Sequence, residues 1–487
     1  MNASRPIAAP SSDRKKRVFG VGAVMTVLIL VELLSSLEAS MLYTALPTIS
    51  RSYGGLTHAG WLISAFVLVQ CATAAIAGRL GDLLGRRTML AGVLLLCTLG
   101  STLSALSSDL HWIIAGRAIQ GMSGAILPLA FGIARSVVPQ ERLPYWIGLL
   151  AGAYSASGAL GFLLGGVLTE SVFGWHGIFT LTAILSALLI PPVLMILPAD
   201  ARRHHAGGID WPGALAMAPA IGGLLLAITY GGQWGWTAPA TLGTALGSLA
   251  VLILWARHEW RCPTPLIDVR LLADRSIAGA NLVFLFLGLS SMQLPLVVMT
   301  MIQQPAWTGI GLGVGAALTG VYKLPSNIIS LGAGPLGGWL FVRFGPRAAV
   351  LTGTTLCCVS WAALILWHDE LIGVLALTVA VGAGMAITLS AVPNLVLAIV
   401  PHERSSEAAG LLQVTRTLGV AAGAQIAATI LSLSQISSPA GKVYPSAHAF
   451  LLSFAIICAV AFCAVLCAFL LPRSGGTPAS KNRAPQA

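Results

Sequence analysis

Long apolar stretches, each about the length needed to cross a bilayer, recur along the whole of this 487-residue chain. A membrane-spanning helix needs about 20 mainly apolar residues. Only 9% of the residues are charged and 56% are hydrophobic, whereas a soluble domain carries about 25% charged residues. The sequence therefore predicts an all-α membrane protein and excludes a soluble globular one. The fourteen candidate transmembrane helices cover residues 18–46, 57–78, 88–107, 110–138, 143–168, 175–197, 210–231, 238–256, 276–302, 308–333, 346–367, 370–400, 405–434 and 447–471.

The distribution of basic residues predicts the orientation of these helices. Of the 27 Lys and Arg residues, Arg117, Lys323 and Arg416 fall within helices, and only Arg51 and Lys442 fall in outside loops when the N-terminus is placed inside. Short cytoplasmic loops carry an excess of Lys and Arg. We therefore expect a multi-pass protein with both termini in the cytoplasm. The net charge of +11 reflects this topology, and no nucleic-acid partner is expected, because the basic residues do not cluster on a polar domain.

An internal repeat divides the chain. The segment GRLGDLLGRR at residues 78–87 matches GWLFVRFGPR at residues 338–347. Secondary transporters are commonly built from such repeats, with the substrate site between the halves near the bilayer midplane. We expect a cytoplasmic N-tail (1–17), an N-terminal six-helix bundle (18–197), two inserted helices with linkers (198–275), a C-terminal six-helix bundle (276–471) and a cytoplasmic C-tail (472–487).

The loop motif at residues 78–87 resembles the cytoplasmic loop signature of the major facilitator superfamily, between its second and third helices. Its glycines permit a tight turn, and Asp82 can pair with an arginine or cap a helix. The fourteen helices resemble the drug:proton antiporter branch of this superfamily and imply its fold, two pseudo-symmetric six-helix bundles plus two inserted helices. We expect a conformational latch made of Gly78, Asp82, Gly85, Arg86, Arg87, Gly345 and Arg347.

Two buried charges are expected to meet in the first half. The stretch from Leu37 to Pro47 resembles the first-helix signature of the fourteen-helix branch, with Glu38 where that branch has Asp. The stretch around Arg117 resembles the superfamily's buried arginine motif. At about 1.5 Å per residue, Glu38 and Arg117 both lie roughly 10–12 Å below the outer surface. The two helices run antiparallel, so a contact between the two side chains is feasible.

Such a pair is suited to proton coupling. Burial favours the neutral carboxyl, whereas a neighbouring arginine favours the carboxylate, so relative movement would load or release a proton. The alternative is a permanent ion pair that holds the two helices together. Glu32 lies near mid-membrane and about 120° around the helix from Glu38, which gives it a separate role as a second proton site or a cavity residue. Its alternative is a protonated carboxyl hydrogen-bonded to a neighbouring helix.

The fifth helix carries closely spaced glycines. This segment resembles the superfamily's antiporter motif, a glycine-rich helix that packs closely against its neighbours. Phe162 stands where the family usually has proline, so the expected kink can be absent. The glycines that carry the resemblance are Gly158, Gly161, Gly165 and Gly166.

Further polar side chains lie within the apolar segments. Ionisable residues in a membrane usually mark substrate or ion pathways, so Lys323 and Arg416 are cavity candidates, with structural pairing or snorkelling as the alternative. For the amides, the alternative is hydrogen bonding between helices. The expected substrate cavity comprises Glu32, Lys323, Arg416, Gln120, Asn281, Gln293 and Asn394, with Gln70 and Gln413 as weaker candidates.

These residues indicate transport and not catalysis. The sequence shows no nucleotide-binding loop, catalytic triad or metal-site spacing, so we expect no enzyme activity, no metal and no cofactor besides the proton gradient. The resemblance implies a monomeric proton-coupled exporter of amphipathic small molecules or drugs in a bacterial cytoplasmic membrane. The alternative is a dedicated exporter of an endogenous lipid, siderophore or antibiotic. With two buried acids and three buried bases, we expect neutral, zwitterionic or anionic amphiphiles as substrates.

Overall fold

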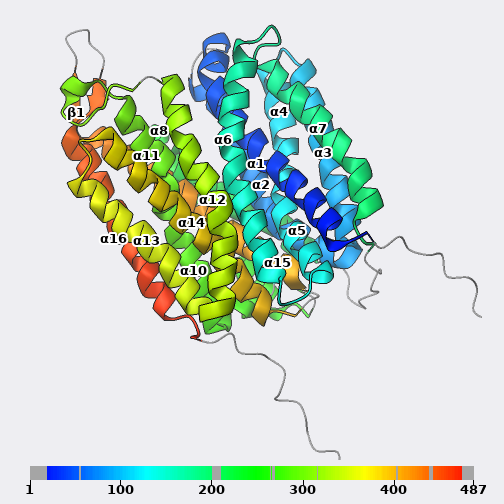
Figure 1. Ribbon diagram of the computed structural model, residues 1–487. Coiled ribbons are helices and arrows are strands. Elements are labelled where there is room, and N and C mark those ends of the chain that lie inside the picture. The colour runs from blue at the N-terminus through cyan, green and yellow to red at the C-terminus, as the bar shows by residue number, and fades with distance from the viewer. Residues whose placement is uncertain are drawn as a thin grey trace, which may run out of the picture.

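Two helical bundles lie side by side in the computed structural model (Figure 1). The structure describes residues 19–53, 56–199, 210–263, 265, 269–314, 316–401, 404–437 and 443–473, with some side chains inside helices excepted. The N-terminal bundle, blue to teal in Figure 1, consists of α1 (Val21–Ser52), α2 (Leu56–Leu84), α3 (Arg86–Leu106), α4 (Leu110–Gln120), η1 (Gly121–Ala125), α5 (Ile126–Val137), α6 (Leu143–Glu170) and α7 (His176–Ile196).

A helical hairpin follows the N-terminal bundle in the sequence. Helices α8 (Trp211–Trp234) and α9 (Pro239–Arg261) pack on each other, and α8 also packs against α2 and α15, so it contacts both bundles. The C-terminal bundle consists of η2 (Val269–Ala273), α10 (Arg275–Leu289), η3 (Ser291–Gln293), α11 (Leu294–Gln303), η4 (Ala306–Thr308), α12 (Ala316–Phe344), α13 (Pro346–Leu366), α14 (Leu371–Ile399), α15 (Ser405–Leu433), the antiparallel strands β1 (Gln435–Ser437) and β2 (Val443–Pro445), and α16 (Ala447–Phe469).

The hydrophobic character of these helices makes this a membrane protein. Within the described residues, 11 helical segments are long and apolar enough to cross a bilayer. Helices α2 and α8 contain shorter apolar stretches, Trp61–Ala74 and Leu215–Ile228. The number of fourteen spans therefore stays a prediction, although each predicted range overlaps one of the helical segments.

Two predicted helices are interrupted. The helix expected at 110–138 winds as α4, η1 and α5, where a Cβ on Gly124 would lie 2.1 Å from the Gln70 carbonyl oxygen. The missing side chain lets η1 lie directly on α2. The helix expected at 276–302 breaks at Ser290, whose φ and ψ are −106° and −92°. Pro295 follows in the first turn of α11, where its missing N–H leaves no partner unsatisfied.

The internal repeat extends to the backbone conformation of its turns. Gly85, between α2 and α3, has a φ of 99°, and Gly345, between α12 and α13, has a φ of 87°. Both values are in the region that favours glycine, so the same tight turn ends the second helix of each half. Gly78 and Asp82 lie in α2, but the surroundings of Gly78 and the side chain of Asp82 lie outside what the structure describes.

The arginine that follows each turn binds the last helix of its own bundle. Arg87 Nη1 donates to the Leu197 carbonyl oxygen at the end of α7, at 3.3 Å. Arg347 Nε donates to the Leu471 carbonyl oxygen after α16, at 2.7 Å, and its Nη2 donates to the Phe469 carbonyl oxygen. A positive charge is favourable at a helix C-terminus, where carbonyl groups lack intrahelical partners. The two arginines therefore occupy equivalent positions, and each binds carbonyl oxygens at the end of its bundle's last helix.

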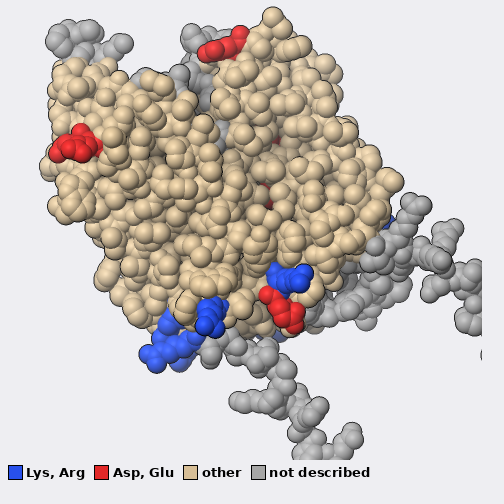
Figure 2. Space-filling view, viewed as in Figure 1, with Lys and Arg blue, Asp and Glu red and all other residues tan. Residues whose placement is uncertain are grey.

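The two bundles meet closely at the lower end in Figure 1, where the described chain begins and ends. In α6 and α12, a Cβ on Gly148 would lie 2.3 Å from the Gly334 carbonyl oxygen, and one on Gly334 would lie 2.2 Å from that of Gly148. Nearby, Arg135 Nη1 donates to Ser405 Oγ at 2.7 Å. On the face shown in Figure 2, the visible Lys and Arg side chains gather at this same end.

Candidate functional site

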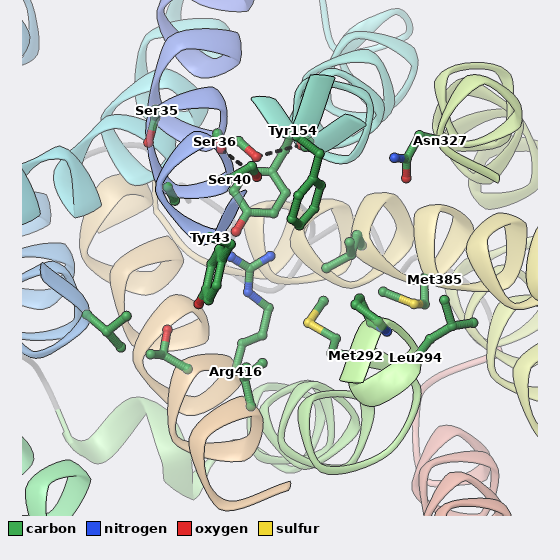
Figure 3. A pocket seen from close by; sticks show the side chains of 18 of the residues that line it. Ser35, Ser36, Ser40, Tyr43, Tyr154, Met292, Leu294, Asn327, Met385 and Arg416 are labelled. Carbon is green, nitrogen blue, oxygen red and sulfur yellow. Dashed lines mark hydrogen bonds between the residues drawn. The ribbon is translucent and has the colours of Figure 1, made fainter. Parts of the chain in front are cut away.

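A cavity of about 350 Å³ lies between the two bundles (Figure 3). Side chains of α1, α2, α4 and α6 form one wall, and side chains of α12, α14 and α15 with the η3–α11 segment form the other. Its apolar lining includes Phe66, Phe162, Met292, Met385 and Leu389, and its polar lining includes Ser35, Ser36, Ser40, Tyr43, Gln70, Arg117, Tyr154, Lys323, Ser326, Asn327, Ser330, Gln413, Arg416 and Thr417.

The structure brings Glu38 and Arg117 together at the N-terminal wall. Arg117 Nη1 lies 3.4 Å from Glu38 Oε1, and both side chains are 2% exposed. Arg117 also donates to Gln120 Oε1 at 2.8 Å and to the Leu62 carbonyl oxygen at 3.2 Å. Its guanidinium carbon lies 4.1 Å from the centre of the Phe66 ring. Arg117 lines the cavity, and these contacts all come from its own bundle. Glu38 is not among the residues that line the cavity.

Glycines set the position of this pair. A Cβ on Gly161 in α6 would lie 2.8 Å from the Leu37 carbonyl oxygen of α1, so α6 packs directly on the turn that carries Glu38. A Cβ on Gly158 would lie 3.6 Å from Ser40 Oγ, an ordinary contact, and a Cβ on Gly166 would meet nothing within 4 Å. Gly165 lies in the same helix, where its carbonyl oxygen accepts a hydrogen bond from Thr169 Oγ1 at 2.6 Å.

Glu32 lies apart from this pair, as its angular offset predicts. It is 1% exposed and does not line the cavity. Arg416, from the opposite bundle, is the cationic group whose charge acts on it. Its Oε2 has no hydrogen-bond partner in the part of the chain that the structure describes. The charge that acts on this buried acid therefore comes from the C-terminal half, whereas Glu38 contacts Arg117 of its own bundle.

Lys323 and Arg416 both line the C-terminal wall. Arg416 is 4% exposed, and its guanidinium carbon lies 4.8 Å from the centre of the Tyr154 ring of α6. Figure 3 shows its side chain extending toward Tyr43 and Tyr154. Among the described residues, neither the Lys323 ammonium nor the Arg416 guanidinium forms a hydrogen bond or an ion pair. The structural-pairing alternative for these two cations therefore lacks an anionic contact partner among the described residues.

Several amides expected in the cavity have other positions. Gln120 is 0% exposed and donates to Ser101 Oγ at 2.5 Å while it accepts from Arg117. Asn281 accepts from Thr415 Oγ1 at 2.9 Å, which joins α10 to α15.

Two further amides bind backbone. Gln293 donates to the Gly288 and Val420 carbonyl oxygens at 2.7 and 3.0 Å. Asn394 donates to the Pro144 carbonyl oxygen at 3.2 Å, across the two bundles. These amides and Gln120 correspond to the helix-joining alternative, because their hydrogen bonds hold helices to one another. Gln70 and Gln413, the weaker candidates, are the two that line the cavity.

The aromatic wall of the cavity was missed by the sequence analysis. The rings of Tyr43 and Phe162 have their centroids 6.4 Å apart. The Phe66 ring contacts the Arg117 guanidinium, and the Tyr154 ring contacts the Arg416 guanidinium. Phe162, which stands where the family usually has proline, therefore forms part of the cavity wall. The sequence does indicate the depth of Tyr43 in the membrane, because Tyr43 follows Glu38 by little more than one helical turn.

One potential metal-ligating group lies outside the cavity. Ligand atoms of Asp210, His258 and Cys262 lie within 4.8 Å of one another at the base of the α8–α9 hairpin. Asp210 Oδ1 accepts from the Gly213 N–H at 3.0 Å, and its Oδ2 lies 2.9 Å from His258 Nε2. These bonds cap α8 and tie it to the end of α9, so the carboxylate already has a structural role. The expectation of no metal site stays a prediction.

Comparison with known proteins agrees with this architecture. A resistance and export protein for tetracenomycin C from Streptomyces glaucescens is 25% identical over 416 residues, which cover 84% of this chain and 75% of that protein. The multidrug resistance protein Stp of Mycobacterium tuberculosis is 27% identical, over 81% of this chain and 73% of Stp. Multidrug resistance protein 3 of Bacillus subtilis is 26% identical, over 62% of each chain.

The fold recurs in a solved structure. The crystal structure of the human organic anion transporter MFSD10 (TETRAN) superposes with a TM-score of 0.65 at 18% identity, over 93% of this chain and 99% of the other. The family profile described as Major Facilitator Superfamily matches residues 28–210 and 279–487. Resistance and multidrug exporters are among the relatives, and the chain is a membrane transporter and not an enzyme. The chain belongs to the major facilitator superfamily.

Proposed function

We propose that this transporter is a proton-coupled exporter of amphipathic small molecules that works by alternating access. The observation that carries the proposal is the Glu38–Arg117 contact of 3.4 Å at the wall of a cavity between two bundles. A carboxyl group buried beside one arginine can bind a proton when the arginine moves away and release it when the arginine returns. Arg117 lines the cavity, so a bound substrate can displace it.

The same proposal extends to topology. We propose fourteen spans in the drug:proton antiporter arrangement, with α2, α8 and α12 completing the set, and a monomer in a bacterial cytoplasmic membrane. The end that carries the latch turns and both ends of the described chain is assigned to the cytoplasm. Support comes from charge, because Arg86, Arg135, Arg142 and Arg347 belong to that end, while Asp109 and Glu370 belong to the other.

The apposition of Gly148 and Gly334 then closes the cytoplasmic side. We propose that the structure represents a state in which the cavity is shut off from the cytoplasm. Substrate and proton would next exchange on the opposite side, and the two bundles would have to separate at these glycines to return.

The test is transport by purified protein in proteoliposomes under an imposed pH gradient, with a chemically diverse panel of amphiphiles. Glu38→Gln should abolish gradient-driven transport and leave substrate binding measurable, because the amide cannot exchange a proton. Glu170→Gln, which alters an exposed carboxylate of α6, is the matched control and should transport like the wild type. Gradient-driven transport by Glu38→Gln would refute the coupling role and favour a permanent ion pair.

A dedicated exporter of one endogenous product, such as a lipid, siderophore or antibiotic, is the second candidate. It is favoured by the relative named for resistance to and export of a single compound, tetracenomycin C. The same panel decides between the two. Transport of many unrelated amphiphiles supports multidrug export, whereas transport of one chemical family supports the dedicated exporter.

A further inference from the structure

We propose that the substrate cavity contains an anion-binding subsite, formed by Arg416 and Lys323, which selects amphiphiles that carry a carboxylate or a similar negative group. The proposal rests on the proposed export function and goes further, because it assigns the charge of the substrate and the residues that recognise it. Three observations carry it: the partners of the cations, the position of the acids and the nature of the remaining wall.

The first observation concerns the partners of the cations. Arg117 is tethered by Glu38, Gln120 and a backbone carbonyl, so its charge is compensated. Arg416 is 4% exposed, and its side chain makes only the ring contact with Tyr154, with no hydrogen bond to any described residue. A buried guanidinium offers five N–H donors, and burying such a charge without a hydrogen-bonded partner is unfavourable. A bound anion would supply the missing acceptors.

The second observation concerns the acids. Among the described residues that line the cavity there is no Asp or Glu, while Arg117, Arg416 and Lys323 all line it. Glu38 is 2% exposed and occupied by Arg117. Glu32 acts on Arg416 through its charge but lies outside the lining. The cavity surface that a substrate would contact is therefore cationic, although the transmembrane helices also contain the buried acids Glu32 and Glu38.

The third observation concerns the rest of the wall. Phe66 and Phe162 belong to the N-terminal bundle, and Met292, Met385 and Leu389 belong to the C-terminal bundle. Flexible methionines and aromatic rings accommodate varied apolar shapes. The wall thus fits an apolar body with one negative group, which is directed to the C-terminal wall, where Lys323 and Arg416 lie.

The arrangement also links substrate charge to the moving parts. Arg416 belongs to α15, whereas Tyr154 belongs to α6, on the opposite side of the interface. An anion that binds the guanidinium competes with the ring contact and with the field of Glu32. Binding would thereby weaken an attraction between the bundles and favour their relative movement.

The experiment is equilibrium binding to purified full-length protein in nanodiscs, with two probes that share one apolar body. One is a naphthyl-alkanoate, and the other is the naphthyl-alkyl-trimethylammonium of equal chain length. The wild type should bind the carboxylate at least tenfold more tightly than the trimethylammonium. Lys323→Gln and Arg416→Gln should each weaken carboxylate binding by about tenfold or more and leave trimethylammonium binding within about twofold.

Two further variants sharpen the result. Lys323→Glu should reverse the preference, because it replaces the cation with an anion at the same position. Arg275→Gln removes an exposed charge at the start of α10 and should behave like the wild type. Tighter binding of the trimethylammonium by the wild type, or equal loss of both probes in Lys323→Gln, would overturn the subsite.

Failure of the proposed function has a different signature. If the wild type prefers the carboxylate but shows no pH-gradient-driven transport of any compound, proton-coupled export is refuted and the subsite stands. If gradient-driven transport is present and depends on Glu38, but the two probes bind equally, the subsite is refuted and the export function stands.

Discussion

A methyl group added at Gly148 should open the end of the transporter that the structure holds closed. The Cβ of Gly148→Ala would lie 2.3 Å from the Gly334 carbonyl oxygen, whereas ordinary contact begins at 3.4 Å. Helices α6 and α12 would have to separate by about 1 Å, because the Cβ position is fixed by the backbone of α6 and the atoms that it meets are backbone atoms of α12. Overpacking of this kind costs about 1–3 kcal/mol. Since each 1.4 kcal/mol is a factor of ten, the closed state should lose roughly 5- to 150-fold in relative population.

The matched control is Gly166→Ala in the same helix. Its Cβ would meet nothing within 4 Å, and both substitutions gain the same helix propensity. Any difference between the two variants therefore reports the contact with α12.

Distances between spin labels on a cysteine-free background measure the change. One label pair, at Val172 after α6 and Ile372 at the start of α14, reports the upper end, opposite the Gly148–Gly334 contact; these side chains are 97% and 82% exposed. A second pair, at Glu141 and Phe344, reports the lower end. Gly148→Ala should lengthen the lower distance and shorten the upper one, while Gly166→Ala should match the parent. Identical distributions in the two alanine variants would refute the assignment of this glycine contact as the closure.

Three further predictions concern the ends of helices. Asp82→Asn should slow turnover in proteoliposome transport without altering the substrate profile, since the latch acts on conformation and not on binding. Arg347→Ala should lower the melting temperature more than Arg87→Ala, because Arg347 donates to two helix-terminal carbonyl oxygens and Arg87 to one, each charged hydrogen bond contributing about 1.5–3 kcal/mol. Asp109 caps α4, and its hydrogen bond from the His111 backbone N–H holds the pKa of that carboxyl below its usual range. The stabilisation by Asp109 should be fully present above about pH 4 and lost as the pH falls through the lowered pKa, which melting curves of Asp109→Ala and wild type against pH will show.

Each of these predictions has an outcome that contradicts it. A changed substrate profile in Asp82→Asn would place the latch in recognition. Equal melting temperatures for Arg347→Ala and wild type would show that the helix-terminal bonds carry no net stabilisation. A stability difference for Asp109→Ala that persists unchanged far below pH 4 would mean that the aspartate acts through something other than its charged cap.

Depth in the membrane could be predicted from the sequence, because helices of known rise cross a layer of known thickness. Counting residues from the outer helix ends puts Glu38 and Arg117 at the same level, and the structure places them 3.4 Å apart. The repeat could be found for a similar reason, because only a residue that tolerates a positive φ serves at Gly85 and Gly345. The family itself follows from these motifs and is confirmed by the match over both halves.

Direction around a helix could not be predicted in the same way. Asn281 and Gln293 lie in segments that are apolar on every side, so no polar face of the helix indicates where each side chain points. Gln120 lies one helical turn after Arg117, on the same face of α4, but that spacing does not distinguish the cavity from Ser101 of α3. Each finds a partner on a neighbouring helix instead of the cavity. The partners are hydroxyl groups or backbone carbonyls, which are so common that sequence gives no specific signal for them. The interruptions at η1 and η3 were missed because they depend on contacts with α2 and on the backbone at Ser290.

The bonds of Arg87 and Arg347 have a mechanical consequence. Each joins the third helix of a bundle to that bundle's own last helix, so both bonds survive intact when one bundle turns against the other. Strain from that rotation would then fall on the contacts that cross the interface, such as the Gly148–Gly334 packing and the bonds from Arg135 to Ser405 and from Asn394 to Pro144. Each bundle would therefore rotate as one rigid body, and a modest change in sequence at the contacts between the bundles would most alter the speed of the cycle.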